Sequence, residues 1–237
     1  VVPVHPFQGR HFDGFAAPPV PPPSFAVGNF NLTLDPQTQH VASLTVPAAD
    51  LPAGVFDFLP NATTFHATHY LGDVTMRVRA AGSGQNFTLL TTGGALAAKA
   101  APLPAKPNEL AAANLTGTLA TNLSLALERH YVRADHGVQM RFELTNKGSA
   151  AIEIGAWGAA MVFDTMAAKQ RDLDGMSGNC SFVDPAICGE GGWVSATRMT
   201  GTGGVLLVVP EEGIGVQAWR LMRESSVPWA YELTSLS

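Results

Sequence analysis

Short stretches of alternating apolar and polar residues, each closed by turn-forming residues, run through most of this 237-residue chain. The clearest are 123–133, 138–145 and 150–156, separated by Asp135-His136-Gly137 and Asn146-Lys147-Gly148. Alternation with a period of two is typical of strands that bury one face, and both separators suit tight reversals. We therefore expect three consecutive antiparallel strands in this part of the chain.

The same pattern recurs on both sides of this segment. It predicts a hairpin over 29–46 with its turn at Asp35-Pro36, and a second pair, 75–79 with 87–91, joined by 80–84. Further strands are expected at 161–163, 193–199, 205–210 and 215–220, with a turn at 200–204 and a brief helix at 164–172. About a dozen strands and very little helix predict an all-β fold, most economically a two-sheet antiparallel β-sandwich.

Two segments depart from this pattern. Residues 1–24 include a proline-rich run at 18–24, which predicts a polyproline II arm ahead of a sandwich domain over 25–237. Residues 95–121 are rich in Ala and Leu but contain Pro102, Pro104 and Pro107, which break any long helix. Only 108–113 could hold a helical turn or two, so we expect a long crossover between two halves.

The composition narrows the class of function. Hydrophobic residues make up 46% of the chain, enough for a sizeable core, while charged residues make up only 14% and the net charge is −5. A chain with so few charges, and with acidic residues in excess, is unsuited to binding the phosphate backbone of nucleic acid or an anionic membrane surface. The glycine-rich run 201–204 precedes a strand rather than a helix, which argues against a phosphate cradle. We expect no cofactor, no nucleic-acid partner and no membrane partner.

Six of the nine asparagines begin an N-x-Ser/Thr sequon with a non-proline middle residue. Chance placement would give about one such sequon in a chain of this composition. The excess predicts a glycoprotein of a eukaryotic secretory pathway, located outside the cell. The predicted N-glycan sites are Asn31, Asn61, Asn86, Asn114, Asn122 and Asn179.

The chain has two cysteines, Cys180 and Cys188. In a secreted protein an isolated, closely spaced pair predicts one local disulfide, with two free thiols as the alternative. This disulfide would close a glycine-rich loop over 173–192. Two cysteines without clustered histidines do not form a zinc framework, so we predict no metal site.

The loop from Cys180 to Trp193 is the strongest candidate for sugar contact. Trp193 could stack on a sugar ring, and Asp184 and Glu190 could accept hydrogen bonds from its hydroxyls. In the alternative, Asp184 begins a turn at Pro185, Glu190 is solvated and Trp193 begins a core strand. No catalytic residue is assigned within the chain.

The histidines show no recognisable metal motif. His66 and His69 are three apart in an extended segment, so they would point to opposite faces. His130 and His136 flank a turn and could meet, although the pattern favours core or solvated histidines over a shared site. Trp157, between two glycines, is expected to fill the core between the sheets.

The second half resembles a known family. The segments Met140–Phe163, Cys180–Pro185 and Leu206–Glu211 resemble the N-terminal β-sandwich of large secreted fungal and bacterial proteins of the six-hairpin glycosidase type. The resemblance covers about 25–237 and implies a mutarotase-like β-supersandwich followed by an (α/α)6 toroid. It also implies glycoside hydrolysis, with the acid and base on the toroid. The chain ends at Ser237 without a helical domain, so those residues have no positions here.

Three hypotheses follow from these observations. The first is the non-catalytic sandwich of a secreted glycoside hydrolase acting on polysaccharide or oligosaccharide, packed on a downstream toroid. The second is a stand-alone carbohydrate-binding or cell-wall interaction module without catalysis. The third is a sugar epimerase, which would need a paired histidine and carboxylate in a concave sheet.

Overall fold

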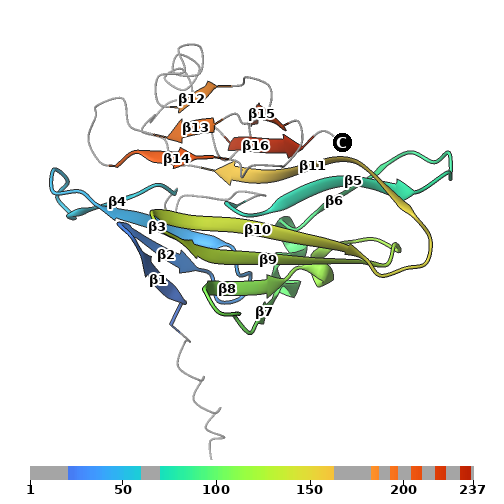
Figure 1. Ribbon diagram of the computed structural model, residues 1–237, viewed down its shortest axis with the longest axis horizontal. Helices are drawn as coiled ribbons and strands as arrows, with labels where there is room; N and C mark the ends of the chain where they lie inside the picture. Colours follow the sequence, from blue (N-terminus) through green and yellow to red (C-terminus); the bar gives the residue numbers. More distant parts are fainter. Residues whose placement is uncertain are drawn as a thin grey trace, which may run out of the picture.

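The computed structural model describes residues 21–59, 70–162, 183–186, 193–196, 204–209, 217–222 and 230–235. These residues form sixteen β-strands and two short 3-10 helices, η1 (Gly94–Lys99) and η2 (Thr116–Thr118). All strand pairs are antiparallel, and hydrogen bonds join the strands into four sheets (Figure 1). The predicted all-β sandwich with very little helix is confirmed. Within this part of the chain, no helix is long and apolar enough to cross a membrane.

The first sheet contains four strands in sequential order. They are β1 (Ser24–Val27), β2 (Phe30–Leu34), β3 (Val41–Pro47) and β4 (Val55–Asp57). The predicted hairpin over 29–46 is confirmed as the pairing of β2 with β3. Its turn forms because Asp35 Oδ1 accepts hydrogen bonds from the backbone N–H groups of Gln37 and Thr38, at 2.9 and 2.7 Å.

The second sheet is built on a long hairpin and has the order β10-β9-β8-β7. Strands β9 (Leu125–Ala134) and β10 (Gly137–Asn146) pair over their full ten residues, as the turn at 135–137 predicted. Strand β8 (Glu109–Asn114) pairs with β9, and β7 (Ala101–Leu103) pairs with β8. This hairpin supplies most of the candidate site described below.

The segment 95–121 is more ordered than a crossover. It contains both 3-10 helices and the β7–β8 hairpin. The expected helical turn at 108–113 is wrong, because β8 exchanges backbone hydrogen bonds with β9. Pairing with a neighbouring strand outweighs the helix propensity of the alanines.

The third sheet has the order β15-β16-β11-β5-β6. Its strands are β5 (Val74–Ala80), β6 (Thr88–Thr91), β11 (Ile152–Val162), β15 (Gln217–Met222) and β16 (Ala230–Ser235). The predicted pairing of β5 with β6 is confirmed. The expected meander of 138–145 with 150–156 is wrong, because β11 leaves β10 and pairs with β5 and β16. Apolar packing explains this change of sheet: Phe142 of β10 meets Trp157 of β11 edge to face, with ring centroids 5.1 Å apart.

The fourth sheet has three short strands, β12 (Val183–Ala186), β13 (Trp193–Ala196) and β14 (Leu206–Val208). The pairing of β13 with β14 confirms the expected hairpin. The expected continuation into 215–220 is wrong, because β15 pairs with β16 in the third sheet. The proline-rich arm was predicted over 1–24, and its residues 1–20 lie outside the described residues. Its predicted end is one residue too late, because Ser24 already belongs to β1. The expected helix at 164–172 and both cysteines also lie outside the described residues.

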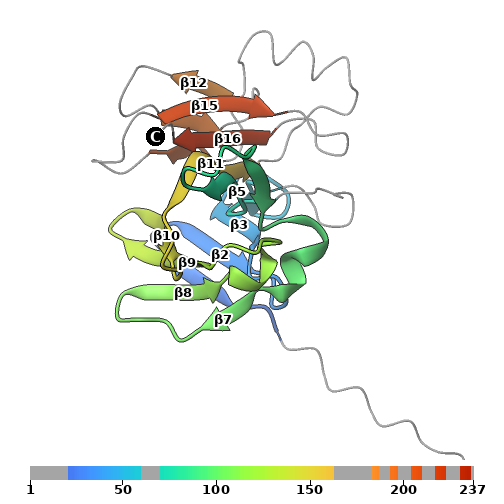
Figure 2. The same ribbon diagram turned by 90° about the vertical axis from the view of Figure 1, so that its right-hand side faces the viewer.

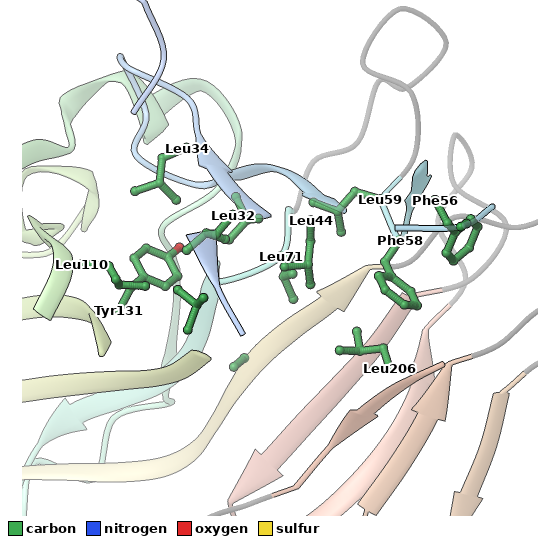
Figure 3. Packing of buried hydrophobic residues seen from close by; sticks show 14 residues of the cluster. Leu32, Leu34, Leu44, Phe56, Phe58, Leu59, Leu71, Leu110, Tyr131 and Leu206 are labelled. Atoms are coloured by element: carbon green, nitrogen blue, oxygen red, sulfur yellow. The ribbon is translucent and has the colours of Figure 1, made fainter. Parts of the chain in front are cut away.

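Two apolar clusters hold the sheets together. The first joins β1–β3 to β9 and β14, and Figure 3 shows its side chains converging from these strands. The second lies between β5 and the strands β8 and β9, and it includes Trp157 at its edge, as the sequence predicted. Each buried Leu or Val contributes about 1.5–3 kcal/mol. The layered arrangement is visible end-on in Figure 2. The inner face of the β7–β10 sheet packs on these clusters, and its outer face points away from them.

Candidate functional site

Strand β9 places different chemistry on its two faces. Leu125, Leu127, Arg129 and Tyr131 alternate along the strand and are buried on the inner face. His130, between Arg129 and Tyr131, belongs to the opposite face because successive side chains of a strand point to opposite sides. Strands β8 and β10 also place ionisable side chains on this outer face.

The hairpin register sets which outer-face residues are neighbours. Ala134 pairs with Gly137 at the turn, and the same register places Glu128 opposite Glu143 and His130 opposite Arg141. Directly opposite residues have Cβ atoms roughly 4.5–5.5 Å apart, so their side chains interact.

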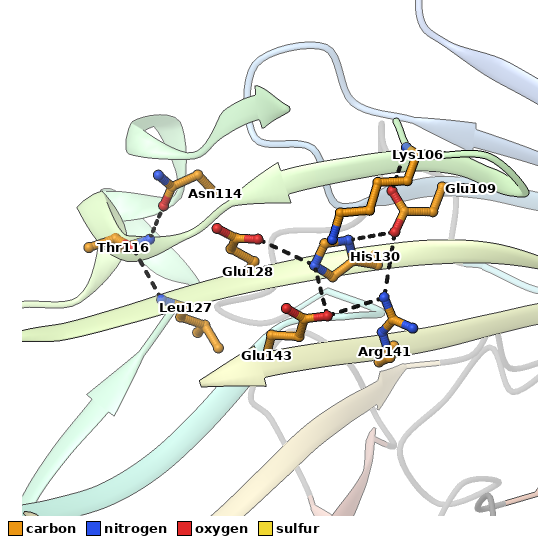
Figure 4. Close-up of polar contacts among 9 residues, drawn as sticks. All are labelled: Lys106, Glu109, Asn114, Thr116, Leu127, Glu128, His130, Arg141 and Glu143. Atoms are coloured by element: carbon orange, nitrogen blue, oxygen red, sulfur yellow. Dashed lines mark hydrogen bonds and ion pairs between the residues drawn. The ribbon is translucent and has the colours of Figure 1, made fainter. Parts of the chain in front are cut away.

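Glu109 joins this group from β8. A β-bulge between Glu109 and Ala111 shifts the register against β9. Oε1 of Glu109 lies 3.1 Å from Nδ1 of His130, and both side chains are nearly inaccessible to solvent, at 4% and 1% exposure. We call Glu109, Glu128, His130, Arg141 and Glu143 the outer-face cluster (Figure 4).

The electrostatics of the cluster are acidic. The backbone N–H of Lys106 donates a 2.8 Å hydrogen bond to Glu109 Oε2. This bond lowers the pKa of Glu109 below its usual value; burial opposes the shift, and nearby His130 and Lys106 add to it. Arg141 Nη2 lies 3.1 Å from Glu143 Oε1 and 3.5 Å from Glu109 Oε1, so one guanidinium serves two carboxylates.

Three members of the cluster offer ligand atoms to a common point. One atom each from Glu128, His130 and Glu143 lie within 4.8 Å of one another. The ring Nε2 of His130 is 3.5 Å from Glu128 Oε2 and 3.8 Å from Glu143 Oε1. Imidazole and carboxylate are common ligands of divalent metals, so this arrangement runs against the prediction of no metal site.

The inner face of β9 has a structural role. Arg129 is fully buried and donates to the backbone carbonyls of Gly72, at 2.7 Å, and Gln39. It thereby ties two loops to the sheet. The neighbouring Tyr131 hydroxyl is buried without a hydrogen-bond partner, and burial raises its pKa to about 12.

A groove of about 660 Å³ lies elsewhere on the molecule. Its residues come from the β1–β2 turn, the end of β3, the β9–β10 turn and the start of β14, and they are mainly apolar. They include Phe30, Val46, His136, Val205 and Leu207. His136 therefore contributes to a surface groove, whereas His130 belongs to the outer-face cluster, so these two histidines do not share a site.

The sequence-predicted sugar contacts lie on a different sheet from the cluster. Asp184 is on β12, opposite Ser195, and Trp193 is on β13, opposite Ala186. Part of the expected loop is therefore a hairpin, and Trp193 begins a strand. Glu190, Cys180, Cys188, His66 and His69 lie outside the described residues.

Among the predicted glycan sites, three asparagines are exposed: Asn31, Asn86 and Asn122. Asn114 is partly buried and pairs with Glu128, which places it next to the outer-face cluster. Its Oδ1 accepts a 2.9 Å hydrogen bond from the backbone of Thr116 (Figure 4). Asn61 and Asn179 lie outside the described residues.

The outer-face cluster was missed by sequence reasoning, apart from His130. A usable indication was present: once the turn at 135–136 is accepted, the period of two pairs Glu128 with Glu143 and His130 with Arg141. The position of Glu109 had no such indication, because a bulge sets the β8 register.

Comparisons with known proteins place the fold. Among solved structures, the chain is similar to "Polysaccharide Lyase BACCELL_00875", with a TM-score of 0.60 and 12% sequence identity. The alignment covers 90% of this chain and 30% of that chain, so the present sequence spans less than a third of that protein. At this identity the likeness establishes the shared fold. No curated protein matches the chain.

A family model also matches the sequence. It aligns with residues 33–234, which include most of the strands of the sandwich and the whole outer-face cluster. The chain therefore belongs to DUF5695, a family of unknown function.

Proposed function

We propose that this chain is the β-sandwich domain of an enzyme that degrades polysaccharide. The observation that carries the proposal is the likeness to a polysaccharide lyase over 90% of the chain. The resemblance of three segments to the sandwich of six-hairpin glycosidases supports the same substrate class independently. In this proposal the sandwich supports a helical catalytic domain, consistent with the 30% coverage of the lyase.

The finer proposal is a secreted glycoside hydrolase. Exposed sequons at Asn31, Asn86 and Asn122 are compatible with N-glycans and an extracellular location. A disulfide between Cys180 and Cys188 belongs to the same proposal. Asp184, Glu190 and Trp193 are the candidate sugar contacts that the sandwich domain would contribute beside the catalytic domain.

The test separates binding from cleavage. The complete natural protein is incubated with a panel of glucans, mannans and pectins, and the products are analysed by mass spectrometry. A hydrolase adds water across the glycosidic bond, whereas a lyase eliminates and leaves an unsaturated sugar that absorbs in the ultraviolet. The proposal predicts cleavage of at least one polysaccharide, and the mass of the product identifies the chemistry.

A parallel measurement addresses the present chain. Affinity electrophoresis on the same panel compares the chain with its Trp193→Ala variant. Retardation without cleavage by the complete protein would favour the binding-module alternative. If the complete protein neither binds nor cleaves any polysaccharide, the proposed substrate class is wrong.

A further inference from the structure

The outer-face cluster contains a buried histidine, His130, whose Nε2 has no hydrogen-bond partner among the described residues. We propose that Glu128, His130 and Glu143 bind a zinc ion through one oxygen of each carboxylate and Nε2 of the imidazole. The three ligand atoms come from adjacent strands of one hairpin and face a common point (Figure 4). The inference is independent of the proposed action on polysaccharide.

The state of His130 is the first argument. Its side chain is only 1% exposed, Nδ1 faces Glu109 Oε1 at 3.1 Å, and Nε2 makes no hydrogen bond within the described part of the chain. A buried polar atom without a partner costs about 1–3 kcal/mol, so an unpaired nitrogen needs an explanation. A metal ion on Nε2 would satisfy this atom, which faces the carboxylates of Glu128 and Glu143.

The spacing of the ligand atoms is the second argument. Ligands at about 2.0–2.2 Å from a tetrahedral zinc are separated from each other by roughly 3.3–3.6 Å. Nε2 of His130 lies 3.5 Å from Glu128 Oε2 and 3.8 Å from Glu143 Oε1. The ligand atoms as a set lie within 4.8 Å of one another, so the two carboxylates would have to move towards each other on binding. Both belong to partly exposed, flexible glutamates, which can supply this movement.

Glu109 provides the third argument. Metal-bound histidines usually direct their other ring nitrogen to a carboxylate, which holds the ring in place and strengthens it as a ligand. Glu109 Oε1 lies 3.1 Å from Nδ1 of His130, and its side chain is 4% exposed. Glu109 is therefore a positioning residue for the proposed ligand rather than a ligand itself.

The charge balance favours a dication. The cluster has three carboxylates against the guanidinium of Arg141 and the nearby ammonium of Lys106, so negative charge is in excess. A zinc ion would offset this excess. Glu128 and Glu143 are 38% and 46% exposed, so the ion can reach the imidazole from solvent between them. Three protein ligands would leave a fourth position for water.

The experiment measures zinc binding to the chain after dialysis against a chelator. Isothermal titration with zinc chloride is compared between the wild-type chain and the double variant Glu128→Gln/Glu143→Gln. We expect the variant to lose one zinc equivalent, or to bind it at least about 100-fold more weakly. Titration with cobalt(II) should give the intense visible absorption of a tetrahedral site in the wild type and not in the variant.

Two controls keep the test decisive. Both glutamates are partly exposed, so the double variant should fold, and circular dichroism verifies this. His136→Asn, a substitution of an exposed histidine outside the cluster, should bind zinc as tightly as the wild type. Equal zinc stoichiometry and affinity in the wild type and the double variant would overturn the proposal, as would an absence of binding to both.

Discussion

Glu128 lies directly opposite Glu143 in the register of the β9–β10 hairpin. Like charges placed opposite each other destabilise a strand pair, so this pairing works against the longest hairpin of the sheet. Arg141 is 3.1 Å from Glu143 and compensates one of the two charges. The other charge, on Glu128, faces the imidazole of His130 at 3.5 Å from Nε2.

Removing one of these charges should stabilise the metal-free protein. In the presence of a chelator, Glu128→Gln should raise the free energy of unfolding by about 0.2–1 kcal/mol, because it removes the repulsion between the two facing carboxylates. Thermal unfolding followed by circular dichroism measures the change. Glu153→Gln is the matched control: Glu153 faces Arg79 at 2.5 Å, so its neutralisation should lower stability. Destabilisation by Glu128→Gln would contradict the repulsion.

Tyr131 should make the fold sensitive to alkaline pH. Burial raises its pKa to about 12, above the usual value of 10, so the unfolded chain loses this proton first. The resulting stability is fully present below pH 10 and is lost as the pH rises towards about 12. Tyr131→Phe should reduce this loss.

The same substitution tests the unpaired hydroxyl of Tyr131. Because that oxygen has no hydrogen-bond partner, Tyr131→Phe should change stability at neutral pH by less than about 1 kcal/mol. Urea denaturation of both proteins at pH values from neutral to alkaline gives the two quantities. A large loss of stability at neutral pH would mean that the hydroxyl is paired.

Gly72 should be intolerant of alanine for two separate reasons. Its φ is +91°, and an added Cβ would lie 3.0 Å from the Tyr131 hydroxyl and 3.3 Å from Nη1 of Arg129. Gly72→Ala should therefore cost about 2–4 kcal/mol. Gly82→Ala isolates the strain, because Gly82 has φ +69° with open space around its Cβ, and it should cost about 1 kcal/mol. Equal losses in urea denaturation would show that the crowding at Gly72 is unimportant.

The change of sheet between β10 and β11 can be tested at Phe142 and Trp157. Their rings meet edge to face at an interplanar angle of 76°. A double-mutant cycle with Phe142→Leu and Trp157→Leu should give a coupling energy of about 0.5–1.5 kcal/mol. A coupling energy near zero for Phe142 and Trp157 would show that the contact between their rings does not hold β10 and β11 together.

Local pairing was predictable where two alternating segments follow each other with only a turn or a short loop between them. The hairpins β2–β3, β5–β6 and β9–β10 follow from alternating residues around turn residues such as Asp35 and Gly137. The prediction failed at 108–113, where alanines suited to a helix form strand β8. At 150–156 the alternation correctly predicted a strand, but the predicted partner strand was wrong. Alternation identifies a strand and its buried face, whereas it carries no information about which sheet that strand joins.

The candidate site likewise has a part that the sequence predicts and a part that it does not. The sequence by itself determined the all-β class and the β9–β10 hairpin, because alternation with a period of two and turn residues at 135–137 specify both. The two-residue turn of the structure then fixes the register, and with it the facing pairs Glu128–Glu143 and His130–Arg141. Only the tertiary structure decided that Glu109 reaches His130, because a bulge sets its register. It also decided that His130 is buried with no hydrogen bond to Nε2 from the described residues, since burial depends on chain segments distant in sequence.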